Sequence, residues 1–177
     1  ICNVFNFKKK KLVRFSSPIV IKNSLPKHLL VQIWDEGDNN YTILNIAPSS
    51  SAALPFDKIR NSISFYLDEF IPGKQNQIFK ADSIVQNTTS GIALGGHYAL
   101  LRSQLYRAYA TIFLEPLIII KNCFPFVLYL QIEGTRGQQS KTVHHVLETQ
   151  DEVMITEFSP DFNAKLRCTT ENFMSND

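Results

Sequence analysis

Histidine and cysteine are the residue types with which this chain could build a metal site. Two adjacent histidines, His144 and His145, lie in a stretch with strand character. Because successive residues of a strand face opposite sides, these two imidazoles are poorly placed to share one ion. Cys123 and Cys168 lack the CxxC or CxxH spacing of a zinc site. We therefore expect no bound metal.

Catalytic and nucleotide-binding motifs are also missing from the sequence. It contains no GxSxG, no phosphate loop and no dinucleotide fingerprint. The glycine pair of "LGGHY" (94–98) favours a bulge or a turn, and the acidic residues are scattered. We expect neither a cofactor nor an enzyme, which leaves a binding module or a structural protein.

Composition narrows the class further. Hydrophobic residues make up 44% and charged residues 19%, which allows a packed core, and the net charge of +2 gives no case for nucleic acid. The odd number of cysteines, three, argues against a disulfide framework and for a reducing compartment. The opening "ICNVFNF" lacks Met, so we expect a fragment of a longer chain. The basic run "FKKKKLVRF" (7–15) fits an anionic membrane surface or, as we favour, a charged edge strand.

One stretch of about fifteen residues occurs twice in nearly the same form, and this repeat indicates how the chain is divided. The stretch "IVIKNSLPKHLLVQI" (19–33) reappears 99 positions later as "IIIKNCFPFVLYLQI" (118–132). Looser matches follow, between 41–48 and 141–148 and between 61–68 and 163–170. Internal repeats of this kind indicate tandem structural units. We expect three segments: 1–11 as the end of a preceding segment, 12–113 as a first β repeat, and 114–177 as a partial second one.

Secondary structure is expected to be nearly all β. Runs such as "PIVIKN" and "FVLYLQIE" are β-branched, of strand length and bounded by turn residues. The segment 97–114 is ambiguous, because Leu101, Leu105, Ala108 and Ile112 have helical spacing while Tyr109, Thr111 and Phe113 alternate. We favour two strands there, since sequential strands usually pair. The fold class is therefore all-β, as tandem β-sandwich-like repeats.

The repeated Asn-x-x-Pro, formed by Asn23 with Pro26 and by Asn122 with Pro125, predicts a sharp corner between two strands. Proline fixes its own φ and extends the preceding residue, while asparagine can close a turn on nearby backbone. A buried amide could satisfy backbone groups freed at the corner. These residues are interpreted as structural turn residues, and alternatively as the rim of a peptide groove as well.

The chain repeats one pattern at an interval of roughly 100 residues: a strand, Lys-Asn, x-x-Pro and a second apolar strand. This pattern resembles the repeats of the adaptor-binding region of the VPS13 family. The segments "SSPIVIKNSLP" and "LEPLIIIKNCFP" look like the starts of two such repeats, and Asn23 and Asn122 match the asparagine that marks each one. The resemblance covers one repeat and the opening of the next. The family region has several repeats, so peptide binding could belong to others.

The resemblance implies a role within a long lipid-transfer protein at organelle contact sites. It implies capture of proline-containing adaptor peptides, a cytoplasmic location, and membrane contact through those adaptors. Strand addition at an exposed edge is the mechanism we expect. Asn23, Pro26, Asn122 and Pro125 are the candidate peptide-binding or repeat-defining residues. The alternative is a structural spacer of the lipid-transfer rod with no ligand of its own.

Overall fold

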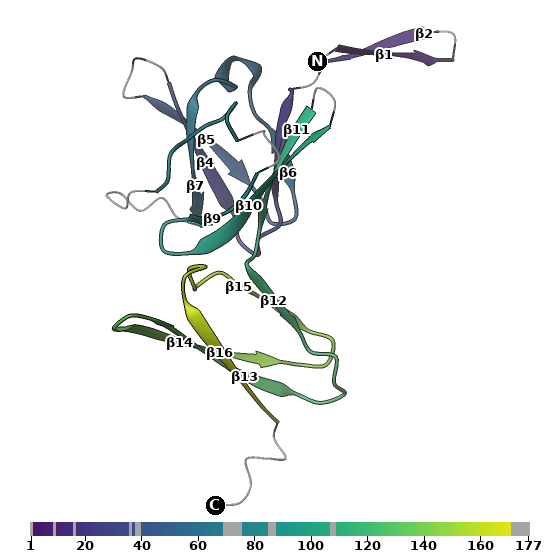
Figure 1. The fold of residues 1–177 in the computed structure, drawn as a ribbon. Helices are drawn as coiled ribbons and strands as arrows, with labels where there is room; N and C mark the ends of the chain where they lie inside the picture. The colour runs from purple at the N-terminus through teal and green to yellow at the C-terminus, as the bar shows by residue number, and fades with distance from the viewer. Residues whose placement is uncertain are drawn as a thin grey trace, which may run out of the picture. The chain divides into compact units, whose positions relative to one another are not determined.

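The structure is a computed structural model, and it describes residues 2–8, 10–15, 17–35, 37, 40–68, 76–84, 88–106 and 109–170. These residues form sixteen strands and one short 3₁₀ turn, η1 (Phe56–Lys58), which confirms the all-β class. The chain divides into two compact units, residues 1–115 and 116–177 (Figure 1). The expected segment boundaries stay a prediction.

The basic run lies on a two-stranded hairpin. Strand β1 (Cys2–Phe7) pairs antiparallel with β2 (Lys10–Phe15), from Cys2 opposite Phe15 to Phe7 opposite Lys10. Lys8, Lys10 and Lys11 are exposed, and Lys9 lies outside the described residues. The boundary expected after residue 11 falls inside β2.

The first unit continues as a sandwich of two sheets. The five-stranded sheet has the order β6 (Ser51–Ala53), β3 (Ile19–Asn23), β11 (Tyr109–Glu115), β10 (Tyr98–Tyr106) and β9 (Thr89–Ala93). The four-stranded sheet has the order β5 (Tyr41–Ile46), β4 (Leu29–Trp34), β7 (Ser62–Leu67) and β8 (Phe79–Lys80). All neighbours are antiparallel except β3 and β11, which run parallel.

A single core joins these sheets, because each strand turns alternate side chains inward. Strand β11 shows the pattern plainly: Ala110, Ile112 and Leu114 are buried while the residues between them are half-buried. The same cluster contains side chains of the opposite sheet, including Val31 and Phe65. The two sheets therefore share one hydrophobic core, which makes the unit a β-sandwich.

The ambiguous segment forms strands, so the favoured interpretation is confirmed and the helical alternative is wrong. Strands β10 and β11 pair antiparallel, with Leu101 opposite Leu114 and Leu105 opposite Ala110. Burial alternates along β10 as expected for a strand, with Ala99, Leu101 and Ser103 buried and the residues between them half-buried. Long-range pairing with β9 and β3 thus overrides the local helical propensity of the segment.

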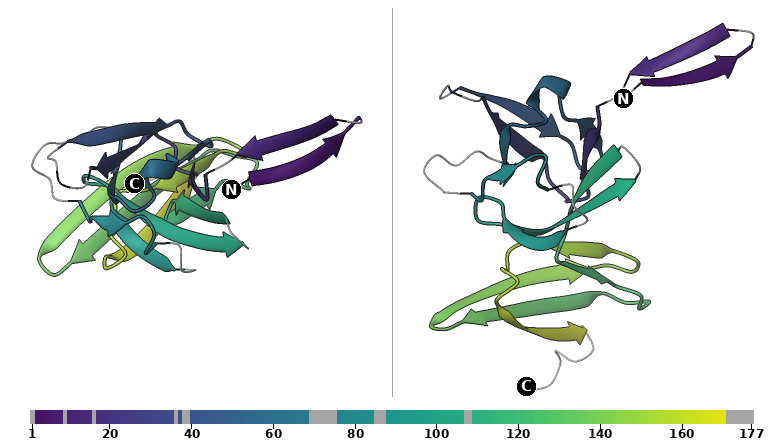
Figure 2. Two further views of the ribbon diagram at one scale, coloured as in Figure 1. Left: turned by 90° about the horizontal axis from the view of Figure 1, so that it is seen from above. Right: turned by 45° about the horizontal axis from the view of Figure 1, so that its top comes forward.

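The second unit repeats the first five strands of that sandwich. Strand β12 (Ile118–Lys121) pairs antiparallel with β15 (Glu152–Ile155), as β3 does with β6. The other sheet has the order β14 (Gln139–Leu147), β13 (Leu128–Arg136) and β16 (Asn163–Thr170), which matches β5, β4 and β7. Figure 2 shows β13 and β14 as a long green hairpin with the yellow β16 beside β13.

The two looser sequence matches name the right strands but are one residue out of register. Ile33 lies opposite Thr42 in the first unit, and its counterpart Ile132 lies opposite Val143 in the second. Position 42 therefore corresponds to 143, whereas the match of 41–48 with 141–148 places it at 142. Likewise Leu67 corresponds to Thr170, because these two residues oppose Leu29 and Leu128.

Candidate functional site

The first corner is held by one asparagine side chain. Asn23 ends β3 and is fully buried. Its Nδ2 donates to the carbonyls of Lys27, Ile46 and Ala47, at 2.8, 2.9 and 3.2 Å. Its Oδ1 accepts from the N–H of Leu25 at 3.0 Å. The amide thus replaces the ladder bonds that the backbone loses where the chain leaves one sheet for the other.

The second corner repeats this set of bonds. Asn122 is fully buried, and its Nδ2 donates to the carbonyls of Phe126, Leu147 and Glu148, at 2.8, 3.0 and 3.0 Å. Its Oδ1 accepts from the N–H of Phe124 at 2.9 Å. Both segments are extended up to the asparagine and turn at the same position. The two copies therefore build equivalent corners.

The prolines stand outside these networks. Pro26 and Pro125 are exposed, and each follows the residue whose N–H donates to the asparagine Oδ1. Each Asn-Pro pair is local to its own corner, and the two corners belong to different units. The structure therefore does not place the four candidate residues in a single site, and their role in peptide binding stays a prediction.

Beside the first corner, β11 covers the free side of β3. The N–H of Ala110 donates to the Pro18 carbonyl at 2.7 Å, and the N–H of Ser24 donates to the Leu114 carbonyl at 2.8 Å. This parallel pairing runs the full length of β3, from Ile19 to the corner itself. Ile19 is accordingly only 5% exposed.

Charged and aromatic groups surround the outer face of this pairing. The Lys22 ammonium lies 5.8 Å from the centroid of the Phe113 ring, and the Arg102 guanidinium lies 4.1 Å from it. Arg102 also forms a two-point ion pair with Glu115, at 2.6 and 3.0 Å. The hydrogen bonds and charge of Arg102 hold the pKa of Glu115 below its ordinary value despite partial burial, and Lys22 adds to the effect.

The counterpart of β3 in the second unit has no such neighbour among the residues that the structure describes. Among the described residues β12 pairs only with β15, on the side that β6 occupies in the first unit. Ile118, the counterpart of Ile19, is 36% exposed, and Ile119 beside it is 55% exposed. Within the described part of the chain, one edge of this apolar strand is therefore unpaired.

An aromatic surface continues from this edge. Phe124 and Phe126 are 54% and 43% exposed, and their rings stack with centroids 5.2 Å apart. The corresponding residues of the first corner are Leu25, which is 1% exposed, and Lys27, which pairs with Asp68. A groove of about 370 Å³ lies here, lined by Phe124, Phe126, Leu128, Cys168, Thr169 and Thr170. The groove is almost wholly apolar in its lining.

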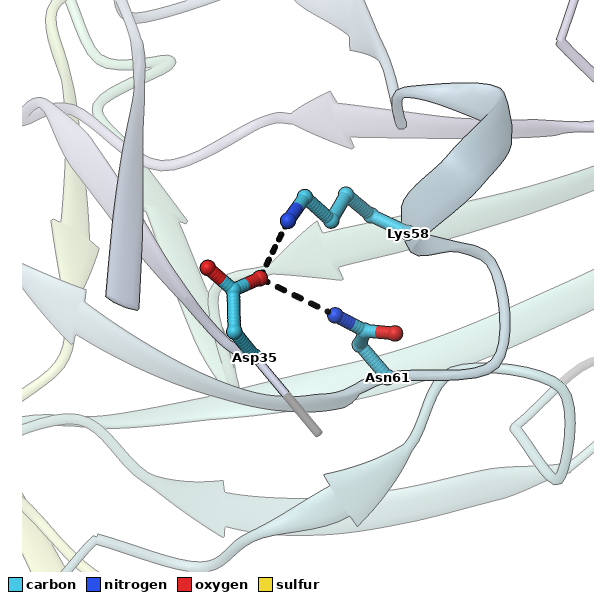
Figure 3. A network of polar contacts seen from close by, with 3 residues as sticks. All are labelled: Asp35, Lys58 and Asn61. Atoms are coloured by element: carbon cyan, nitrogen blue, oxygen red, sulfur yellow. Dashed lines mark hydrogen bonds and ion pairs between the residues drawn. The ribbon is translucent and has the colours of Figure 1, made fainter. Parts of the chain in front are cut away.

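The two units differ at the position that Asp35 occupies after β4 in the first unit. In the first unit the carboxylate of Asp35 accepts from Lys58 and, at 3.4 Å, from the amide of Asn61 (Figure 3). The hydrogen bond to Asp35 raises the pKa of Lys58 against a smaller opposing desolvation. In the second unit Gly134 stands in place of Asp35, packed under the ring of Phe158. A polar contact in one copy is an aromatic contact in the other, so this feature is structural.

The described part of the chain shows neither a metal-binding cluster nor a membrane-spanning helix. The described residues contain no cluster of three or more His, Cys, Asp or Glu side chains that could hold an ion. His144 is exposed while His145 is half-buried, as expected for neighbours on one strand. Within the same residues no helix is long and apolar enough to cross a membrane.

The edge of β12 and the pair Phe124–Phe126 were not among the residues predicted from the sequence. One signal was available: "LPK" in the first copy becomes "FPF" in the second, so two aromatics flank the repeated proline. The pairing of the edge has no such signal, because it depends on which other strands lie beside β12 and not on the residues of β12 itself.

Comparison with known families agrees with the repeated corner. Residues 3–177 match the model of one family, described as the adaptor binding domain of vacuolar-sorting associated protein 13. The chain belongs to this VPS13 adaptor-binding family. The expected resemblance is confirmed, and with it an adaptor-binding role for a module built of β-rich repeats. A comparison with curated proteins finds no significant match.

Proposed function

We propose that this VPS13 adaptor-binding chain recognises short, extended, proline-containing peptides of organelle-specific adaptor proteins. The observation that carries the proposal is the match of residues 3–177 to the adaptor-binding family. Among the described residues, the edge of β12 away from β15 is unpaired, and an apolar groove is lined by Phe124, Phe126 and Leu128. An added strand would gain main-chain hydrogen bonds from the edge and seat alternate side chains against apolar surface.

Proline suits such a ligand for two physical reasons. A strand added at one edge bonds to the sheet through alternate residues, and the N–H groups of the others point away. Proline at those outward positions removes no hydrogen bond to the sheet. Proline also keeps the free peptide extended, so less conformational entropy is lost on binding.

We further propose that adaptors bring the chain, as part of a lipid-transfer protein, to organelle membrane contact sites from the cytoplasm. The exposed lysines of the β1–β2 hairpin, Lys8, Lys10 and Lys11, are few for stable anchoring to anionic lipid by charge alone. Recruitment through a bound adaptor peptide would supply the second, specific contact.

Fluorescence anisotropy with a library of labelled twelve-residue peptides tests the proposal. Peptides with prolines at alternate positions should bind the 177-residue chain with dissociation constants on the order of micromolar, corresponding to about −8 kcal/mol. Matched peptides with alanine for proline should bind several-fold more weakly. Absence of binding by any proline-containing peptide would contradict the proposal and support a spacer within the lipid-transfer rod.

A further inference from the structure

Among the described residues, the hairpin β1–β2 forms a sheet of its own, and none of its described side chains belongs to the core of the sandwich that follows. Val4 and Val13 lie opposite each other, on one face, and are 60% and 47% exposed. An isolated two-stranded hairpin is only marginally stable in water. The valine face, defined by Val4 and Val13, therefore needs a partner surface.

The pairing of this hairpin repeats that of β10 with β11 at the interval of 99 residues that also relates the two corners. Its six residue pairs correspond to six consecutive pairs of β10 and β11. The outermost pairs are Cys2 with Phe15 and Phe7 with Lys10 in the first hairpin, and Leu101 with Leu114 and Tyr106 with Tyr109 in the second. Two residues join the strands in each hairpin. The hairpin β1–β2 is therefore the equivalent of β10–β11.

The first unit shows which face such a hairpin buries. Ser103 and Ile112 are the counterparts of Val4 and Val13, and they are 4% and 0% exposed. Ile112 lies in the core because β11 is paired in parallel with β3 and its inward side chains meet those of the opposite sheet. The valine face thus corresponds to the face with which β10–β11 closes its sandwich.

Strand β3 is not available as the partner of β2. Both of its sides are already paired, with β6 and with β11. The last hairpin of the first unit pairs with the first strand of its own sandwich, and the chain then passes through residues 116–117 to β12. Residues 16–18 connect β2 with β3 in the same way. By this rule β2 pairs with the first strand of the repeat that it ends, and that strand is not β3.

We infer that the valine face of hairpin β1–β2 docks on a further β-sandwich of the same kind, in which β2 lies parallel to a first strand like β3. This partner strand carries branched apolar side chains at alternate positions and ends in an asparagine that builds the corner. Phe15 lies opposite that asparagine, as Leu114 lies opposite Asn23. The carbonyl of Phe15 accepts from the residue after the asparagine, as the Leu114 carbonyl accepts from the N–H of Ser24 at 2.8 Å. The boundary between repeats then lies in the linker before β3 and not within β2.

The tip of the hairpin differs from its counterpart in a way that this arrangement accommodates. Lys11 is exposed and takes the position of Ala110, which is 2% exposed. In the first unit, Ala110 and Leu105 line an open hollow of about 350 Å³. A lysine at this position has room to lay its aliphatic stem along the hollow and to keep its ammonium in water. The tip lysines therefore stay in solvent while the valine face is covered.

Maleimide labelling of single cysteines tests whether the valine face is covered. The two proteins are the 177-residue chain and a version of the natural polypeptide that begins about 100 residues earlier, one repeat interval, each with all other cysteines replaced by serine. Val13→Cys should react at least about tenfold more slowly in the longer polypeptide, because labelling of a buried thiol depends on local opening. Val4→Cys gives a second reading with the same expectation. Lys10→Cys, on the outward face, should react at rates within about twofold of each other in the two proteins.

Disulfide formation in the longer polypeptide tests the partner strand and its register. Ile112 lies opposite Ile21, so Val13→Cys should bridge to a cysteine at the counterpart of Ile21, two residues before the asparagine of the partner strand. A cysteine at the counterpart of Val20 is the matched control. Its side chain points to the opposite face of the sheet, so it should bridge at least about tenfold more slowly.

Equal labelling of Val13→Cys in the two polypeptides would overturn the inference, as would bridging at neither position or faster bridging at the control position. Slow labelling of the 177-residue chain that appears only at high protein concentration would assign the valine face to a second copy and overturn it too. None of these readings involves an adaptor peptide. The inference therefore stands or falls separately from the proposed function.

Discussion

Replacing a repeated asparagine with alanine should destabilise its unit, and Asn23→Ala should do so more than Asn122→Ala. Each side chain joins four backbone groups, which alanine leaves without that partner. At the first corner two of these bonds are fully buried, those with the Ile46 carbonyl and the Leu25 N–H. At the second corner only one bond is fully buried, the one with the Leu147 carbonyl. Water can replace the partner of a part-buried group more readily.

The magnitude follows from this difference in burial. A buried polar group left without a partner destabilises the folded state by about 1–3 kcal/mol. Two such groups at Asn23 give about 2–4 kcal/mol after partial relaxation, and one at Asn122 gives about 1–3 kcal/mol. The matched controls Asn45→Ala and Asn163→Ala remove exposed asparagines and should stay within about 0.5 kcal/mol of the parent chain.

Urea denaturation followed by two probes separates the units. Trp34 is the only tryptophan and lies on β4, so its fluorescence follows the first unit, while far-ultraviolet circular dichroism follows both. Asn23→Ala should lower the fluorescence midpoint clearly. Asn122→Ala should shift the circular dichroism transition more than the fluorescence. Midpoints equal to those of the controls in both variants would refute the view that these amides hold the corners.

Three further predictions concern packing, pH and salt. Gly134→Ala should destabilise the second unit by about 1–3 kcal/mol, because the added Cβ would lie 2.4 Å from a ring carbon of Phe158, whereas Gly137→Asn, at an open left-handed position, should change the urea midpoint little. Ionised Glu115 contributes to the stability of the fold above its ordinary pKa of 4.5, and this contribution is lost as the pH falls through its lowered folded-state pKa. Below pH 4.5 the urea midpoint should therefore fall more steeply in the parent chain than in Glu115→Gln. Peptide affinity should change less than about threefold between low and physiological salt, since main-chain bonds dominate, and liposome flotation that is salt-sensitive without peptide binding would instead assign the working surface to the hairpin lysines.

The corners were predictable from the sequence because two independent copies carry the same residues at the same spacing. Asn23 and Asn122 are followed by proline at the same distance, and turn chemistry alone explains why. The strands on either side were equally clear from their β-branched runs. What the sequence could not do was distinguish a helix from a hairpin at 97–114, where local spacing favoured both and pairing with β3 and β9 decided.

The register of the later strands was not predictable for a physical reason. The side-chain period of a strand fixes its register only where one face is buried. Strand β7 is buried almost throughout, but its counterpart β16 is exposed at nearly every position. The sequence of β16 therefore shows no alternation of buried and exposed residues that would fix its register. The hairpin after β13 is also two residues longer than the one after β4: Ile132 lies opposite Val143, but Ile33 opposite Thr42. The candidate edge was hidden for a related reason, because its pairing depends on other strands and not on the residues of β12.

Residue-resolved amide hydrogen exchange of the 177-residue chain, with and without a bound proline-containing peptide, tests the central claim most directly. The backbone N–H of Asn122 already donates to the Asp151 carbonyl on the β15 side, as the backbone N–H of Asn23 donates to the Ser50 carbonyl. The backbone N–H groups of the alternate residues of β12 therefore face its unpaired edge. Strand addition there predicts slowed exchange at the amides of Ile119, Lys121 and Cys123, with those of Ile118, Ile120 and Asn122 unchanged. Slowed exchange confined to another strand, or none along β12 at saturating peptide, would contradict the account.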